Sequence, residues 1–200
     1  MDGAAILARL GTRLGGRVLE THAHRGDHTA VVAREGLLDA LAFCRDEPDL
    51  RFDLLADLTA VDYSRFPGRE DGPRFEVVYH LYSDRHPAWL RVRARVNRAD
   101  PHIPTITGLW EGAMFHEREM FDMMGIVFDG NRDLRRIYMS PDYRSFPQRK
   151  DFLLPDDAAD SSAAGVRPLE RPETWDLTRL SDELAPGVIT HAEAEAEVKP

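Results

Sequence analysis

The stretch FEVVYHLYSDRHPAWLRVRARV, residues 75–96, decides the fold, because it contains two strand patterns around a short turn. Apolar residues occupy every second position of both runs: Phe75, Val77, Tyr79 and Leu81, then Leu90, Val92, Ala94 and Val96. This period is typical of a strand with one buried face. The intervening SDRHP is rich in turn-forming residues. Residues 75–96 therefore predict two adjacent antiparallel strands.

A third alternating run, residues 52–60, precedes this hairpin and is separated from it by the turn-rich segment FPGREDGP. The predicted core face of the three strands carries Leu54, Leu58, Val77, Tyr79, Val92 and Val96. The opposite face of the last strand carries Arg91, Arg93 and Arg95. This stripe fits the hydrated face of a half-exposed strand, and the alternative is a docking surface for an acidic partner or a phosphate.

The N-terminal third predicts two helices and a hairpin. Residues 6–14 have apolar side chains at helical spacing, and strand patterns at 18–24 and 28–33 flank a turn at 25–27. A second helix places Leu37, Leu38, Leu41 and Cys44 on one side. We expect Cys44 to be a core residue, with a reactive thiol as the less favoured alternative. The predicted class is α+β, with N-terminal helices packed on a mostly antiparallel sheet, followed by a short helix and an extended C-terminal tail.

Composition excludes several kinds of protein. One cysteine allows no internal disulfide and no cysteine-based zinc or iron–sulfur site. The longest stretch without a charged residue, 101–110, is too short to span a membrane, and the N-terminus does not resemble a secretory signal. The net charge of −9 lies mostly in residues 156–200, which hold 4 basic and 11 acidic residues. We therefore expect no membrane span, no nucleic-acid partner and an extended acidic tail.

Residues 116–152, HEREMFDMMGIVFDGNRDLRRIYMSPDYRSFPQRKDF, carry the densest mixture of charged, methionine and aromatic residues. On a helix, Arg118 and Asp122 are spaced for an i,i+4 ion pair, and Gly125 is suited to end it. Met120, Phe121 and Met124 are expected on its packed side. Glu117 and Glu119 point to different sides of such a helix, which disfavours a joint acid/base role.

Other catalytic and metal signals are absent or weak. His116-Glu117 begins an HExxH pattern, but Met120 stands at the second ligand position. His22, His24 and His28 fall in a predicted hairpin, where a fortuitous cluster is favoured over a metal site. No Gly-rich phosphate loop or GxSxG motif occurs.

The cations of the C-terminal part of this segment have two interpretations. They are Arg135, Arg136, Arg144, Arg149 and Lys150, and the acidic Asp133, Asp142 and Asp151 lie among them. This arrangement favours salt bridges between proteins over phosphate binding.

Several blocks of this chain closely resemble the C-subunit (thirty-kilodalton) family of proton-pumping NADH:quinone oxidoreductase, respiratory complex I. The signature lies within residues 103–155 and consists of EREMFDMMGIVFDG, DLRRI, DY and FPQRKDF. LTAVDY at 58–63 and RFEVVYHLYS at 74–83 look like the central strands of the family. We divide the chain into an α+β domain (1–100), the signature segment (101–155) and the acidic tail (156–200).

The resemblance implies a structural subunit without a cofactor, within a complex whose FMN and iron–sulfur clusters lie in other subunits. It implies a peripheral position at the cytoplasmic side of the membrane, bracing a D-type subunit that forms the quinone pocket with a B-type subunit. Any contact with quinone would be indirect.

By resemblance, one set of residues forms the signature helix and turn: Glu117, Arg118, Glu119, Asp122 and Gly125. A second set docks on partners: Arg135, Arg136, Arg149, Lys150 and Asp151.

Two family histidines are replaced, by Asn131 and Phe146. The equivalent subunits of membrane-bound hydrogenases and F420H2 dehydrogenases are therefore an open alternative. A second alternative, of a different class, is an independent enzyme that uses the carboxylate- and arginine-rich segment.

Overall fold

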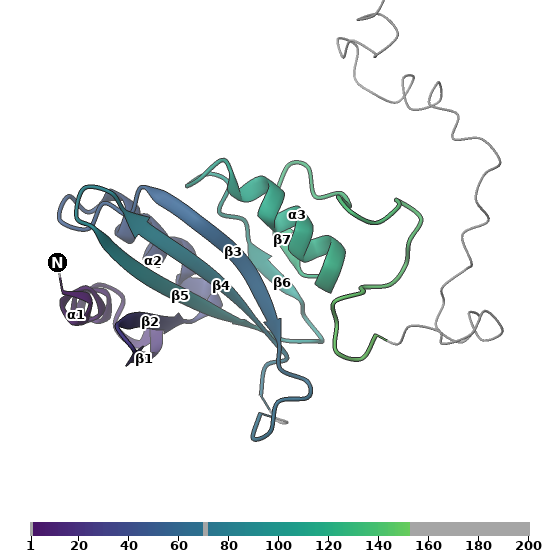
Figure 1. The fold of residues 1–200 in the computed structure, drawn as a ribbon, viewed down its shortest axis with the longest axis horizontal. Helices are drawn as coiled ribbons and strands as arrows, with labels where there is room; N and C mark the ends of the chain where they lie inside the picture. The colour runs from purple at the N-terminus through teal and green to yellow at the C-terminus, as the bar shows by residue number, and fades with distance from the viewer. Residues whose placement is uncertain (1, 70–71, 153–200) are drawn as a thin grey trace, which may run out of the picture.

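The computed structural model describes residues 2–69 and 72–152 (Figure 1). Its helices are α1 (Gly3–Leu14), α2 (Leu37–Asp46) and α3 (Ala113–Met124), with short 3-10 turns η1 (Gly15–Arg17) and η2 (Arg34–Gly36). Its strands are β1 (Val18–His24), β2 (Asp27–Val32), β3 (Leu54–Asp62), β4 (Phe75–Ser83), β5 (Ala88–Val96), β6 (His102–Pro104) and β7 (Val127–Asp129). The predicted α+β class is confirmed. The acidic tail lies outside the described residues.

The main sheet has the strand order β1-β2-β5-β4-β3. The predicted antiparallel hairpins are present as β1–β2, β3–β4 and β4–β5. One pairing was not predicted: β2 joins β5 in parallel, with Thr29 opposite Arg91. Residues 33–87 separate these two strands in the chain, so no local pattern could indicate that they pair. A small parallel pair, β6–β7, lies outside the main sheet.

One hydrophobic core joins the helices to one face of the sheet. Leu10 of α1 and Leu41 of α2 are fully buried in the same cluster as Tyr79 and Val92. Cys44 is also fully buried, and this burial raises the pKa of its thiol to about 12, which confirms the core interpretation. Leu38 is 41% exposed, so its predicted place on the packed side of α2 is wrong.

The bulge in β3 explains a second error. The register shifts between Leu55 and Asp57, so one extra residue reverses which side chains face the core. Before the bulge, Leu54 pairs with Tyr82 and is 51% exposed, whereas beyond it Leu58 is 1% exposed. The prediction that Leu54 is a core residue is therefore wrong. The other five members of the predicted core set are buried.

The other face of the sheet is covered by its own arginines. Arg91 pairs with Asp27, Arg93 with Glu76, and Arg95 with Glu20. Beneath these side chains lie Val31, Val78 and Thr29, all buried although they face away from the helices. The arginine stripe is therefore occupied by ion pairs within the chain, because its aliphatic stems also shield apolar side chains from water.

The α3 helix lies beyond the β3 edge of the sheet, and the chain then runs around its outer side (Figure 1). Met120, Met123 and Met124 of α3 and Phe128 of β7 belong to the same hydrophobic cluster as the sheet. Within the described part of the chain, no helix is long and apolar enough to cross a membrane.

A candidate docking site built from α3 and the strap

Residues 131–152, which we call the strap, form neither helix nor strand and are held against α3 and the sheet by polar ties. The strap is the C-terminal part of the segment singled out by its sequence. Its contacts decide which of the candidate residues face inward and which face solvent.

Gly125 makes the close approach of the strap to α3 possible. It ends α3 in the left-handed conformation, with φ 71°, as the sequence predicted. A Cβ atom here would lie 2.5 Å from Nη2 of Arg149 and 2.6 Å from Cζ of Phe146. Glycine is therefore required both by the backbone and by the packing of the strap.

Asp122 forms the first tie between α3 and the strap. Its carboxylate is fully buried and accepts hydrogen bonds from the backbone N–H groups of Ile137, Tyr138 and Met139, at 3.0, 2.7 and 2.9 Å. Arg136 adds an ion pair at 2.6 Å. Burial alone would raise the pKa of Asp122, but these hydrogen bonds outweigh it and hold the pKa below its ordinary value. Asp122 therefore supports the strap as a carboxylate.

Arg118 also contacts the strap, and not Asp122 as predicted. Its guanidinium donates to the carbonyl oxygens of Arg135, at 3.1 Å, and Arg136, at 3.0 Å. The predicted i,i+4 pair is wrong because the strap supplies backbone acceptors for Arg118 and backbone donors for Asp122. Of the three apolar residues expected on the packed side of α3, Met120 and Met124 are buried and Phe121 is half-buried.

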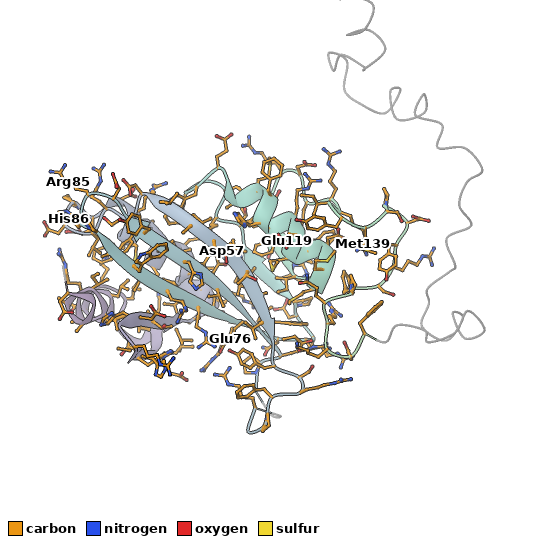
Figure 2. All side chains as sticks on the ribbon, viewed as in Figure 1. Asp57, Glu76, Arg85, His86, Glu119 and Met139 are labelled. Atoms are coloured by element: carbon orange, nitrogen blue, oxygen red, sulfur yellow. The ribbon has the colours of Figure 1, made fainter. Side chains whose placement is uncertain are left out.

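Glu117 lies in a separate buried pocket between α3, the loop after β6 and the start of the strap. It accepts hydrogen bonds from the Thr105 hydroxyl (2.6 Å), the Ile106 N–H (2.7 Å) and Nδ2 of Asn131 (2.8 Å). Burial nevertheless raises its pKa. Asn131 thus uses one of the two departures from the family pattern to contact this carboxylate. Glu119 is half-exposed on α3 (Figure 2).

The second tie is at the C-terminal end of α3. Nε of Arg149 donates to the carbonyl oxygen of Met124 at 2.6 Å, and the Gln148 N–H donates to that of Met123 at 3.1 Å. The Arg149 guanidinium also lies 4.2 Å from the ring centre of Phe146, the other departure from the family pattern. Burial lowers the pKa of Arg149, although its value stays that of a permanently charged group.

The third tie connects the strap to the main sheet. Arg74 forms ion pairs with Asp62 at 2.8 Å and with Asp151 at 2.6 Å. Asp62 also accepts the Lys150 N–H at 2.9 Å. Burial works to raise the pKa of Asp62, but Arg74 and the backbone donors lower it far below its ordinary value.

Sequence reasoning missed Asp62 and Arg74, although both lie in blocks that were recognised. Their signal is topological, because an acid at the end of β3 and an arginine just before β4 meet only when those strands pair.

The remaining strap side chains face outward. Arg132 and Arg144 are exposed and form no ion pair with any residue between 2 and 152 that the structure describes. Arg135 is 70% exposed and contacts Asp133 at 2.8 Å. Tyr138 is 66% exposed, and Phe115 on α3 is 55% exposed. We call Phe115, Arg132, Arg135, Tyr138 and Arg144 the outer strap surface.

The predicted site residues are therefore divided by the fold. Inward-facing ties are made by Glu117, Arg118, Asp122, Arg136, Arg149 and Asp151, and Gly125 makes room for them. Glu119, Arg135 and the side chain of Lys150 remain accessible. No group of three or more His, Cys, Asp or Glu side chains arranged for a metal occurs in the described ranges. The arrangement offers a cationic and aromatic surface on a firmly held backbone.

Comparison with known proteins identifies the family. The family model for the 30 Kd subunit of respiratory-chain NADH dehydrogenase matches residues 30–158. The chain belongs to this family.

Curated relatives within the 30-kDa family are similar over most of their length. The C subunit of NADH-quinone oxidoreductase from Roseiflexus sp. (strain RS-1) is 44% identical over 154 residues, covering 77% of this chain and 86% of the relative. The second of the C subunits of this enzyme from Rhizobium meliloti (strain 1021) is 44% identical over 140 residues, covering 70% and 74%. The family match thus covers the sheet, α3 and the strap, and ends near the start of the acidic tail.

Solved structures agree with this family assignment. The trypsin-resistant fragment (1–134) of Nqo5 is 33% identical with a TM-score of 0.58, covering 67% of this chain and all of the fragment. A chain of a membrane-bound sulfane sulfur reductase, an archaeal respiratory membrane complex, is 23% identical with a TM-score of 0.62, covering 87% of this chain and 96% of that chain. The second likeness shows the fold alone.

Proposed function

We propose that this 30-kDa-family chain is a non-catalytic subunit of the peripheral arm of an NADH:quinone oxidoreductase, and that it braces the quinone-proximal D-type subunit. In this role it holds no redox cofactor, and FMN and iron–sulfur clusters belong to other subunits. The complex lies at the cytoplasmic side of the membrane, and the chain contacts the D- and B-type subunits. The names of the curated relatives favour this complex over a hydrogenase or an F420H2 dehydrogenase.

The observation that carries the proposal is the three-point attachment of the strap. Buried carboxylates at Asp122 and Asp62 hold its backbone, so the outer strap surface is already in position before a partner arrives. Preorganisation lowers the entropic cost of association. Arginine and tyrosine are also the residue types most enriched at binding hot spots. These properties suit a permanent brace between subunits.

The charge of the strap indicates an acidic partner surface. Residues 131–152 hold six cations and three carboxylates, a net charge of +3. The ties use Arg136 and Arg149 internally, which leaves Arg132 and Arg144 for a partner. Complementary charge increases the rate and specificity of association.

Charge reversal within the assembled enzyme tests this proposal. Arg132→Glu with Arg144→Glu should reduce recovery of the D-type subunit with this chain and lower NADH:quinone reductase activity in membranes. The matched control, Arg13→Glu with Arg85→Glu, also reverses two exposed arginines, and Figure 2 shows Arg85 at the end of the sheet remote from the strap. Full assembly and activity with both variants would refute docking through the outer strap surface. Turnover by the isolated chain would refute the non-catalytic role.

A further inference from the structure

The described chain ends beside a cluster of charged residues that its own ties do not neutralise. We call it the exit cluster; it consists of Arg74, Arg98, Arg149, Lys150, Asp62 and Asp151. Four cations face two carboxylates, so the cluster has a net charge of +2. The positive excess lies where the chain leaves the strap.

Two cations of the exit cluster are accessible. The Arg98 side chain is 71% exposed, and its one ion pair in the described ranges is a long contact of 3.7 Å with Asp151. Asp151 is already held by Arg74 at 2.6 Å, so Arg98 is weakly satisfied. Lys150 is exposed and contributes its backbone N–H to Asp62, while its ammonium has no ion pair with a described residue. Both cations can accept a carboxylate without breaking a tie.

The segment that follows carries the complementary charge. Asp156, Asp157 and Asp160 come five, six and nine residues after Asp151. An extended chain of that length spans at most about 17 to 30 Å, so these carboxylates are confined near the exit cluster. A short tether of this kind corresponds to an effective concentration on the order of millimolar. The family match ends at residue 158, so this acidic run lies at the edge of the shared structure.

We propose that the acidic run Asp156–Asp160 folds back on the exit cluster, with its carboxylates paired to Arg98 and Lys150. The exit cluster is thus a docking site for the chain's own tail. The pairing closes the strap at its C-terminal end, next to the Arg74 tie. It also sets the point from which residues 161–200 leave the domain. The outer strap surface remains free, because Arg132 and Arg144 take no part.

Backbone dynamics of the full-length chain test the proposal directly. We expect the amides of residues 156–160 to show the high heteronuclear NOE of ordered backbone at low ionic strength, and to lose it in 1 M NaCl, where charges are screened within about 3 Å. Arg98→Glu with Lys150→Glu should cause the same loss. Reversing the tail as well, with Asp156→Lys, Asp157→Lys and Asp160→Lys, should restore the order.

Arg13→Glu with Arg85→Glu is again the matched control and should leave the tail amides ordered. Unchanged amide shifts in β4 and β5 would show that each variant is folded. Tail amides that are mobile in the wild-type chain, or ordered regardless of the charge at 98 and 150, would overturn the proposal. Failure to restore order in the swapped variant would also overturn it, because paired charges must be interchangeable.

Discussion

Replacing Asp122 by asparagine tests whether one buried carboxylate holds the strap in place. Asp122→Asn keeps the size of the side chain but removes its charge and one of its two acceptor oxygens. The remaining amide must face three backbone N–H donors and Arg136, and its own NH2 group has no acceptor among them.

The expected cost follows from the burial of this group. Removing one partner of a buried ion pair typically costs about 3 to 5 kcal/mol, because the other charge stays buried without compensation. Asp122 is fully buried and Arg136 is 11% exposed, so solvent offers little relief. We therefore expect the free energy of unfolding, or of local opening at the strap, to fall by about 3 to 5 kcal/mol.

Two measurements distinguish global from local loss. Urea unfolding reports the whole domain, and hydrogen exchange of the Ile137, Tyr138 and Met139 amides reports opening of the strap. The control is Asp133→Asn, which removes a carboxylate whose pair with Arg135 is largely exposed and should cost no more than about 1 kcal/mol. Asp122→Asn with unchanged amide protection and an unfolding free energy within about 1 kcal/mol of wild type would refute this reasoning.

The same residue predicts a pH dependence. The pKa of Asp122 is lower in the folded chain than its ordinary value of 3.8. Its contribution is therefore present above the unfolded pKa and is lost as the pH falls from there through the folded pKa. The wild-type chain should lose stability more steeply than Asp122→Asn below about pH 4. Parallel pH profiles would contradict the tie.

Three further substitutions or probes test the fold. Gly125→Ala should destabilise the chain by at least about 1 to 2 kcal/mol from the left-handed backbone alone, because φ is 71° and the new methyl group also displaces Arg149; an unchanged urea midpoint would contradict this. Leu58→Ala should cost about 2 to 5 kcal/mol, whereas Leu54→Ala should cost under about 0.5 kcal/mol, since only Leu58 is buried; equal costs in urea unfolding would show that the bulge is misplaced. The Cys44 thiol, fully buried and with a pKa raised to about 12, should react with Ellman's reagent at pH 8 only after unfolding, and rapid labelling of the folded chain would contradict its core position.

Local patterns indicated most of the elements. Alternation in residues 75–96 predicted the β4–β5 hairpin, and the spacing before Gly125 predicted α3 and its end. These features depend on neighbours in the chain, because side-chain period and helix termination are local properties. The same locality explains the error at Leu54, where a bulge changes the period within one strand. A sequence pattern cannot show where an extra residue is accommodated.

The roles of the charged residues were decided by the tertiary structure. The sequence showed that Arg118, Asp122, Arg136 and Arg149 lie in a dense charged segment, and the helical spacing paired the first two. The fold instead pairs Asp122 with Arg136 and directs Arg118 and Arg149 to backbone carbonyl groups. The physical reason is that a strap without helix or strand leaves its backbone groups unsatisfied. Buried N–H and C=O groups must find partners, so they recruit the nearest charged side chains wherever the packing brings them.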